Sequence, residues 1–203
     1  MRYGQIRRNL EVLRNEQLIP DKLEKVADVG FGSGAGSIAL AELFRQATIT
    51  AIDNASSQQN NPDYRRRVLP RWTSRLKDVS DDVKKVAPEL GFHNVVMASR
   101  IPFSDLESPV DWKEDSLMAA RTFVALASLA EPEKGVVLVG YNPHEDPGAL
   151  WELTQRVNPG NLFKNLTRYQ VEHGDDWLVA RGVKKDILQE AKSKPEMLLT
   201  KLG

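Results

Sequence analysis

The sequence predicts an α/β protein, a three-layer sandwich with helices on both faces of a mostly parallel, twisted sheet and an antiparallel strand near the end of that sheet. Three observations predict this fold. A buried strand, a glycine-rich turn, an amphipathic helix and a second strand follow one another from Val26 to Asp53, which is the βαβ order of parallel sheets. A helix then leads into the apolar strand 135–140. Two final strands, 166–172 and 177–181, are joined by a hairpin signal.

The composition limits both the size and the class of the protein. With 203 residues, the chain is long enough for one domain with a sizeable core. We expect a single domain over 1–203, with an N-terminal helix at 1–20, a core at 26–182 and a helical tail at 184–203.

Several classes of site are excluded by residue counts. There is no cysteine, which rules out disulfides, thiolate metal sites and a cysteine nucleophile. With only three histidines, a multi-histidine metal site is not expected. The 28 basic and 28 acidic residues cancel, so only a local patch could attract a nucleic acid. The chain lacks an apolar run of about 18 residues and a signal-peptide h-region. We therefore expect a cytoplasmic protein with no membrane partner and no metal.

The first segment, residues 3–18, predicts a helix that precedes the first strand. Ile6, Leu10, Leu13 and Leu18 recur near helical spacing, and Ile19-Pro20 should end the helix. We expect it to pack on the sheet. The alternatives are that it covers a ligand site or presents its arginines to a substrate.

The glycine-rich turn that follows the first strand is the main candidate for a ligand site. Gly30 and Gly32 permit a tight turn and let backbone N–H groups approach a ligand. Residue 33 or Gly34 should cap the next helix, whose unsatisfied N-terminal donors would point into the site.

Two kinds of ligand are compatible with this turn. Gly30-x-Gly32-x-x-Ala35, with Asp53 further on, fits the dinucleotide fingerprint. However, Asp28 would then lie near a pyrophosphate and repel it. A carboxylate at this position favours a ligand that carries a positive charge, such as an amino group or a sulfonium.

The pattern Asp28-x-Gly30-x-Gly32-x-Gly34, followed by Asp53, resembles motif I of the class I S-adenosylmethionine-dependent methyltransferases. The resemblance implies a Rossmann-like fold with S-adenosyl-L-methionine as the cofactor. It further implies that the glycine loop, including Phe31, approaches the methionine part and that Asp28 orients the amino group. Asp53, with neighbouring Asn54, would lie at the ribose.

The segment 64–79 concentrates positive charge in an otherwise neutral chain. Tyr64, Val68, Trp72 and Leu76 repeat every four residues, which predicts a helix that Pro70 either starts or kinks, continued by a second helix at 81–90. Six basic residues lie between them: Arg65, Arg66, Arg67, Arg71, Arg75 and Lys77. Such a basic helix could contact the phosphates of RNA or DNA, with Arg66 and Arg71 as candidate substrate contacts. The alternative is a solvated face whose arginines pair with acids elsewhere.

The strand at 94–98 has two possible places in the sheet. If it is the third strand, the resemblance puts Ser99 near the adenine and hides the fourth strand around 106–112. If it is the fourth, the loop 99–105 flanks the transferable methyl group. In either case the acid that usually contacts the adenine amino group is missing from this segment.

The later part of the chain offers a second match to the family. Asp111 and Glu114 have capping-box spacing at the start of a helix, and LAEPEKGVVLVG resembles the helix, turn and fifth strand of the family. Tyr141 and Asn142 follow that strand and are candidate substrate contacts. With Pro143 they form only a fragment of the Asn/Asp-Pro-Pro-aromatic motif, and they follow a different strand from the one that carries it.

The resemblance implies methyl transfer from S-adenosylmethionine, and no catalytic residue is evident. Three functions stay open: a methyltransferase acting on RNA or another phosphate-bearing substrate, a small-molecule methyltransferase in which the N-terminal helix and 54–75 form a lid, and an inactive binding module.

Overall fold

The structure is a computed structural model of the chain. It describes the following residues: 2–30, 34–53, 68–72, 87–99, 112–141, 154–172 and 175–200. For 2, 53, 68–72, 112–115 and 141, it describes the backbone alone. Statements about the molecule below refer to these residues.

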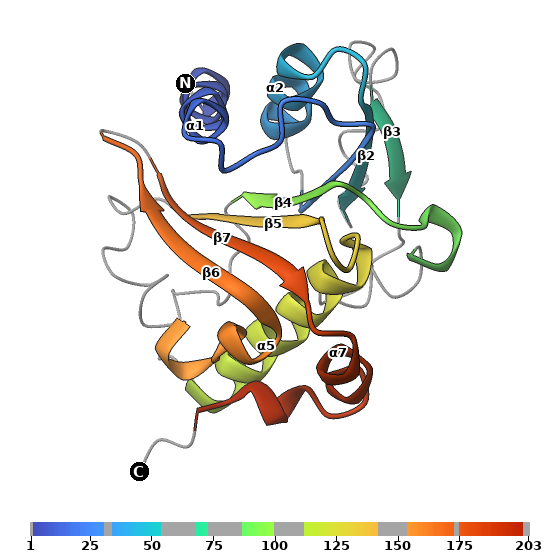
Figure 1. Cartoon of the computed structure of the whole chain (residues 1–203), viewed down its shortest axis with the longest axis vertical. Coiled ribbons are helices and arrows are strands. Elements are labelled where there is room, and N and C mark those ends of the chain that lie inside the picture. Colours follow the sequence, from blue (N-terminus) through green and yellow to red (C-terminus); the bar gives the residue numbers. More distant parts are fainter. Residues whose placement is uncertain are drawn as a thin grey trace.

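A single sheet runs through the described part of the chain, with seven strands in the order β3-β2-β1-β4-β5-β7-β6 (Figure 1). The strands are β1 (Lys25–Val29), β2 (Thr48–Asp53), β3 (Val68–Trp72), β4 (Val95–Ser99), β5 (Val136–Tyr141), β6 (Phe163–Gln170) and β7 (Asp176–Val183). The first five are parallel, and β7 is antiparallel to both β5 and β6. This is the predicted mostly parallel sheet with antiparallel pairing near its end.

Helices cover both faces of the sheet (Figure 1). On one face lie α1 (Arg2–Asn15) and α2 (Ala35–Leu43), and on the other lie α5 (Trp112–Leu129) and α7 (Lys185–Ala191). Two 3-10 helices, η2 (Pro159–Asn161) and η3 (Pro195–Leu198), follow later in the chain, and residues 87–90 and 154–156 are also helical. Each face has its own buried core, with Leu10 and Leu40 on the first face and Phe123 and Leu126 on the second.

The N-terminal helix packs on the sheet as expected, but it ends three residues before the predicted end at 18. Gln17 has a positive φ of 58°, and its N–H donates to the carbonyl of Arg14 while the Leu18 N–H donates to that of Leu13. This 6→1 and 5→2 pair is a Schellman ending. The chain therefore turns at Gln17, before Ile19-Pro20.

The predicted basic helix at 64–79 is wrong where the structure describes it. Residues 68–72 form β3, which pairs in parallel with β2 and places Pro70 opposite Ala51. A spacing of four residues puts Val68 and Trp72 on one face of a strand as well as a helix, because four is also a multiple of two. β3 is an edge strand of the sheet, where the missing N–H of Pro70 is tolerated. Of the predicted helix 81–90, residues 87–90 are helical, and 73–86 lie outside the described residues.

The last strands are confirmed, with shifted ends. β6 begins three residues earlier and ends two residues earlier than predicted, and β7 extends beyond the predicted strand at both ends. In the tail, α7 and η3 are separated before Pro195. No helix in the described ranges is both long and apolar enough to cross a membrane.

Candidate functional site

The carboxyl ends of β1, β2 and β4 bring three of the predicted cofactor residues to one edge of the sheet. Val29 lies opposite Ile52, so Asp53 and Gly30 each follow by one residue, and the Gly30 N–H donates to the Ile52 carbonyl at 2.7 Å. Asp28 lies opposite Met97, so Ser99 is level with Gly30 on the other side. Between β1 and β4 the strand order reverses, and this switch point is where open α/β sheets bind ligands.

The glycine turn has the conformation that only glycine adopts readily. Gly30 and Gly34 have φ of 70° and 83°, in the left-handed region. Gly34 is the N-cap of α2, one of the two predicted caps. The first N–H groups of α2 have no partner within the helix and carry its positive dipole end, so this edge favours an anionic group of a ligand.

Asp28 is buried beneath the turn and is bonded to the helix that follows it. Its side chain is 1% exposed, and Oδ2 accepts a hydrogen bond from Ser37 Oγ at 2.5 Å. Gly36 explains the close fit, because a Cβ there would lie 3.0 Å from Asp28 Oδ2 and 2.7 Å from Met97 Cε. The first turn of α2 therefore sits directly on this carboxylate.

Sequence reasoning missed Ser37. The available signal was a single hydroxyl within the apolar stretch AGSIALA, nine residues after Asp28. Gly36 lies inside α2, where its lack of a side chain serves helix–strand packing. The amino-group contact expected of Asp28 stays a prediction.

The place of Ser99 is settled by the strand order. The strand that contains it pairs with β1 and β5 and is the fourth strand in the described part of the chain, which is the second of the two expected places. Ser99 is half-buried and lies opposite Gly140. The position beside the transferable methyl group, which the resemblance implies for the fourth strand, stays a prediction. The third strand is β3, and the residues after Trp72, where an adenine contact would be expected, lie outside the described part.

The remaining predicted site residues are described in part or not at all. Arg71 lies in β3 opposite Ile52, and Tyr141 ends β5 opposite Asp176; only their backbones are described. The other predicted contacts lie outside the described residues: Phe31, Gly32, Asn54, Arg66 and Asn142.

Beside this edge, Trp177 packs against the end of β5. It lies opposite Gly140 and is fully buried. A Cβ on Gly140 would be 2.7 Å from the indole ring, so the ring occupies the space that a side chain would need. Ser99, Gly140 and Trp177 thus form one row across three strands at the carboxyl edge.

Two carboxylates at the start of β7 bind the carboxyl edge of the sheet to α1 and to β6. The sequence analysis did not propose them as site residues. Asp175 is 2% exposed and accepts hydrogen bonds from Gln5 at 3.1 Å and Asn9 at 2.8 Å. Asp176 accepts from Arg168 at 2.6 Å. The N-terminal half of α1 is therefore bonded to the carboxyl edge of the sheet.

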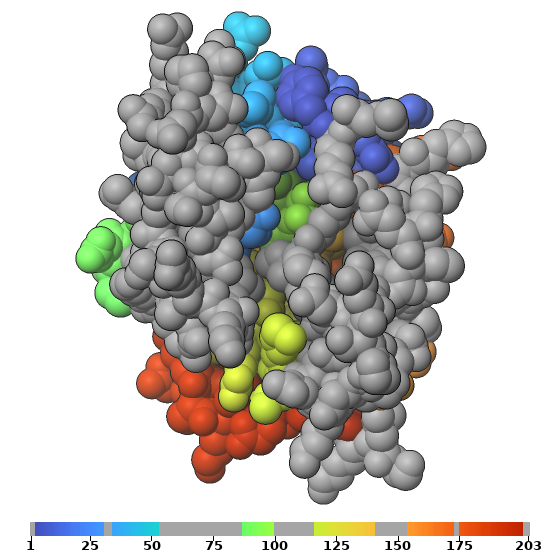
Figure 2. Space-filling view, turned by 180° about the vertical axis from the view of Figure 1, so that it is seen from behind, coloured from blue at the N-terminus to red at the C-terminus, as the bar shows by residue number. Residues whose placement is uncertain are grey.

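Figure 2 shows the molecule from behind, where parts of the chain between 87 and 99 (green) and of α5 (yellow-green) reach the surface.

In the described part of the chain, no three His, Asp or Glu side chains are grouped so that they could hold a metal ion.

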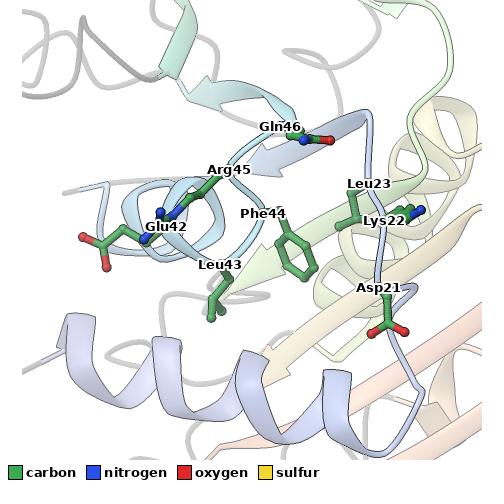
Figure 3. A pocket seen from close by; sticks show the side chains of 8 residues that line it. All are labelled: Asp21, Lys22, Leu23, Glu42, Leu43, Phe44, Arg45 and Gln46. Carbon is green, nitrogen blue, oxygen red and sulfur yellow. The ribbon is translucent and has the colours of Figure 1, made fainter.

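A pocket of about 300 Å³ lies at the opposite edge of the sheet (Figure 3). It is formed where the chain enters β1 and where it leaves α2, and its lining residues are Asp21, Lys22, Leu23, Glu42, Leu43, Phe44, Arg45 and Gln46. Because it is remote from the glycine turn, it is not the candidate cofactor site.

Comparison with known proteins identifies the fold. No protein-family model matches the chain, and no curated protein matches it. Solved structures do match. Human methyltransferase-like protein 13, solved with SAH, has a TM-score of 0.55 at 17% identity, covering 97% of this chain and 90% of that one.

Two further matches are also described as methyltransferases. An O-methyltransferase family protein from Burkholderia thailandensis has a TM-score of 0.54 at 14% identity, over 90% of this chain and 58% of that one. A Thermus thermophilus 16S rRNA methyltransferase, solved with AdoMet and guanosine, has a TM-score of 0.52 at 20% identity, over 85% and 41%. This chain therefore spans 58% of the length of the first of these two neighbours and 41% of the second. Its fold is that of the class I S-adenosylmethionine-dependent methyltransferases.

Proposed function

We propose that the protein binds S-adenosylmethionine at the carboxyl edge of β1, β2 and β4 and transfers its methyl group to an acceptor. The observation that carries this proposal is the arrangement at the switch point of the sheet, where Gly30 and the start of α2 at Gly34 lie beside the end of β2 at Asp53 and the end of β4 at Ser99. The bound cofactor supplies an electrophilic methyl group on a positively charged sulfur.

The residues present fit this ligand. The N-terminal donors of α2 suit the carboxylate of its amino-acid half, and Asp28 suits a cationic centre because opposite charges attract most strongly where water is excluded. Asp53 is proposed to hold the ribose hydroxyls. Methyl transfer then requires the acceptor to lie in line with the methyl group, about 3 Å away, with water excluded. Ser99 is proposed to lie on that acceptor side.

For the acceptor, we propose RNA or another phosphate-bearing molecule. Support comes from the six basic residues within 65–77, which flank β3 next to the strand that carries Asp53. Arg66 and Arg71 are the proposed contacts. A small-molecule acceptor is the second candidate. Residues 68–72 of the expected lid form β3 in the sheet, so the proposed cover is α1, whose Gln5 and Asn9 are bonded to Asp175 at this edge.

Calorimetric titration tests the cofactor. We expect S-adenosylmethionine and S-adenosylhomocysteine to bind and NAD not to bind. Asp53→Ala should lower the affinity for S-adenosylhomocysteine by about tenfold to a hundredfold, since it removes hydrogen bonds to a charged group. Asp21→Ala, which removes an exposed acid at the opposite edge, is the matched control and should leave affinity unchanged. Absence of S-adenosyl binding, or binding indifferent to Asp53, would refute the proposal.

Transfer of tritiated methyl groups tests the acceptor. The enzyme is incubated with labelled S-adenosylmethionine and, separately, total RNA or a small-molecule extract. An RNA acceptor predicts label in RNA, a rate that falls steeply with salt, and a loss on Arg66→Ala or Arg71→Ala that Arg14→Ala does not share. Label confined to the small-molecule fraction would replace RNA by the second candidate, and no transfer with intact cofactor binding would indicate an inactive binding module.

A further inference from the structure

A buried hydrogen bond joins the two ends of the glycine turn. Asp28 precedes the turn on β1 and Ser37 follows it on α2, and both side chains are at most 1% exposed. The Ser37 hydroxyl donates to Asp28 Oδ2 at 2.5 Å, the short length typical of an O–H donor bonded to a carboxylate. The bond therefore joins β1 to the first turn of α2.

The packing around this bond leaves little freedom to α2. Gly36 lies so close to Asp28 and Met97 that a Cβ would be 3.0 Å and 2.7 Å from their nearest atoms. Ser37 is the third residue of α2, so its backbone N–H belongs to the group at the helix start that lacks intrahelical partners. Fixing Ser37 thus fixes the donors that would face the ligand.

Core packing alone does not account for this arrangement. A buried carboxylate is costly to desolvate, and an apolar pair of similar volume would be about as stable. The carboxylate instead lies where it can bond β1 to the first turn of α2.

We propose that Ser37 is a positioning residue for the cofactor: through Asp28 it holds the first turn of α2 against β1 and so sets the loop for the amino-acid half of S-adenosylmethionine. This inference rests on the proposed function. It predicts that loss of the hydroxyl weakens ligands that carry the amino acid and spares ligands that lack it.

The test compares two probes by calorimetry, S-adenosylhomocysteine and 5′-methylthioadenosine, which keeps the nucleoside but has no amino acid. Ser37→Ala should weaken S-adenosylhomocysteine by about tenfold, the usual worth of one hydrogen bond to a charged group, and methylthioadenosine by less than about twofold. Ser37→Thr, which retains a hydroxyl, should restore most of the affinity. Ser128→Ala removes a hydroxyl that is bonded within α5 and should change neither affinity.

The outcomes separate this inference from the proposed function. If the wild-type protein does not bind S-adenosylhomocysteine, the proposed function is refuted. If it binds, but Ser37→Ala weakens both probes equally or weakens neither, the positioning role is refuted. Should Ser37→Ala not fold, Ser37→Cys keeps a side chain of similar size but replaces the hydroxyl by a weak hydrogen-bond donor, and it is expected to show the same selective loss; an equal effect on both probes would refute the inference.

Discussion

Replacing Gly36 by alanine tests the contact between α2 and β1. The added Cβ would lie 2.7 Å from Met97 Cε and 3.0 Å from Asp28 Oδ2, whereas carbon atoms in contact prefer about 3.5–4.0 Å. Met97 is fully buried and Asp28 is held by Ser37. Relief therefore requires either a rotated methionine or a displacement of the first turn of α2 by roughly an ångström.

Two opposing effects set the size of the expected change in stability. Overpacking a core costs about 1–3 kcal/mol, and alanine gains about 1 kcal/mol over glycine inside a helix. We therefore expect a net loss of up to about 2 kcal/mol in the free energy of unfolding. The effect on ligand binding should be larger, because a misplacement of this size at a site costs up to about a hundredfold.

Urea denaturation gives the stability and calorimetric titration with S-adenosylhomocysteine gives the affinity. Gly4→Ala is the matched control, since Gly4 is an exposed residue of α1 with nothing within 4 Å of an added Cβ. It should gain stability by about 0.5–1 kcal/mol and leave affinity unchanged. Met97→Ala in the Gly36→Ala background removes the closest atom and should recover part of the affinity.

Unchanged affinity in a folded Gly36→Ala protein would refute the reasoning, because it would show that the start of α2 does not hold the ligand. Equal stability gains for Gly36→Ala and Gly4→Ala would refute the packing argument.

Three further perturbations test other parts of the fold. Gly140→Ala pushes a Cβ to 2.7 Å from the Trp177 ring and should cost about 1–3 kcal/mol by overpacking, measured by urea denaturation; a neutral result would contradict the packing. Gln17→Gly should stabilise by about 0.5–1 kcal/mol, since φ is +58° there and glycine lacks the Cβ penalty; a lower midpoint would count against it. Burial lowers the pKa of His93 below 6.5, so in acid the unfolded chain binds more protons than the folded one. The free energy of unfolding should therefore fall as the pH drops below about 6.5, by at most about 1.4 kcal/mol per pH unit. His93→Gln should reduce this pH dependence, and an unchanged dependence would assign it to other groups.

Much of the candidate site was predictable because it is local in sequence. Gly30 and Gly34 adopt left-handed backbone conformations that other residues avoid, and a strand, a cap and a helix within 28 residues are specified by patterns of hydrophobicity and turn chemistry. The position of Asp53 was predictable for the same reason, because this residue ends the second strand of the unit. The hydrogen bond from Ser37 to Asp28 was not predictable, since nothing in the apolar pattern of α2 shows which β-strand residue its hydroxyl meets.

The βαβ unit, the glycine cap and the final strand pair could be inferred from residue order alone, because each depends on neighbours close in the chain. The tertiary structure decided the rest. Residues 68–72 have a spacing compatible with helix and strand, and pairing with β2 makes them a strand. The strand that ends at Ser99 had two possible places in the sheet, and its pairing with β1 and β5 decided between them. Asp175 joins α1 to the same edge across 166 positions of sequence. Such contacts are set by which elements become neighbours, and the local pattern of a chain does not encode that choice.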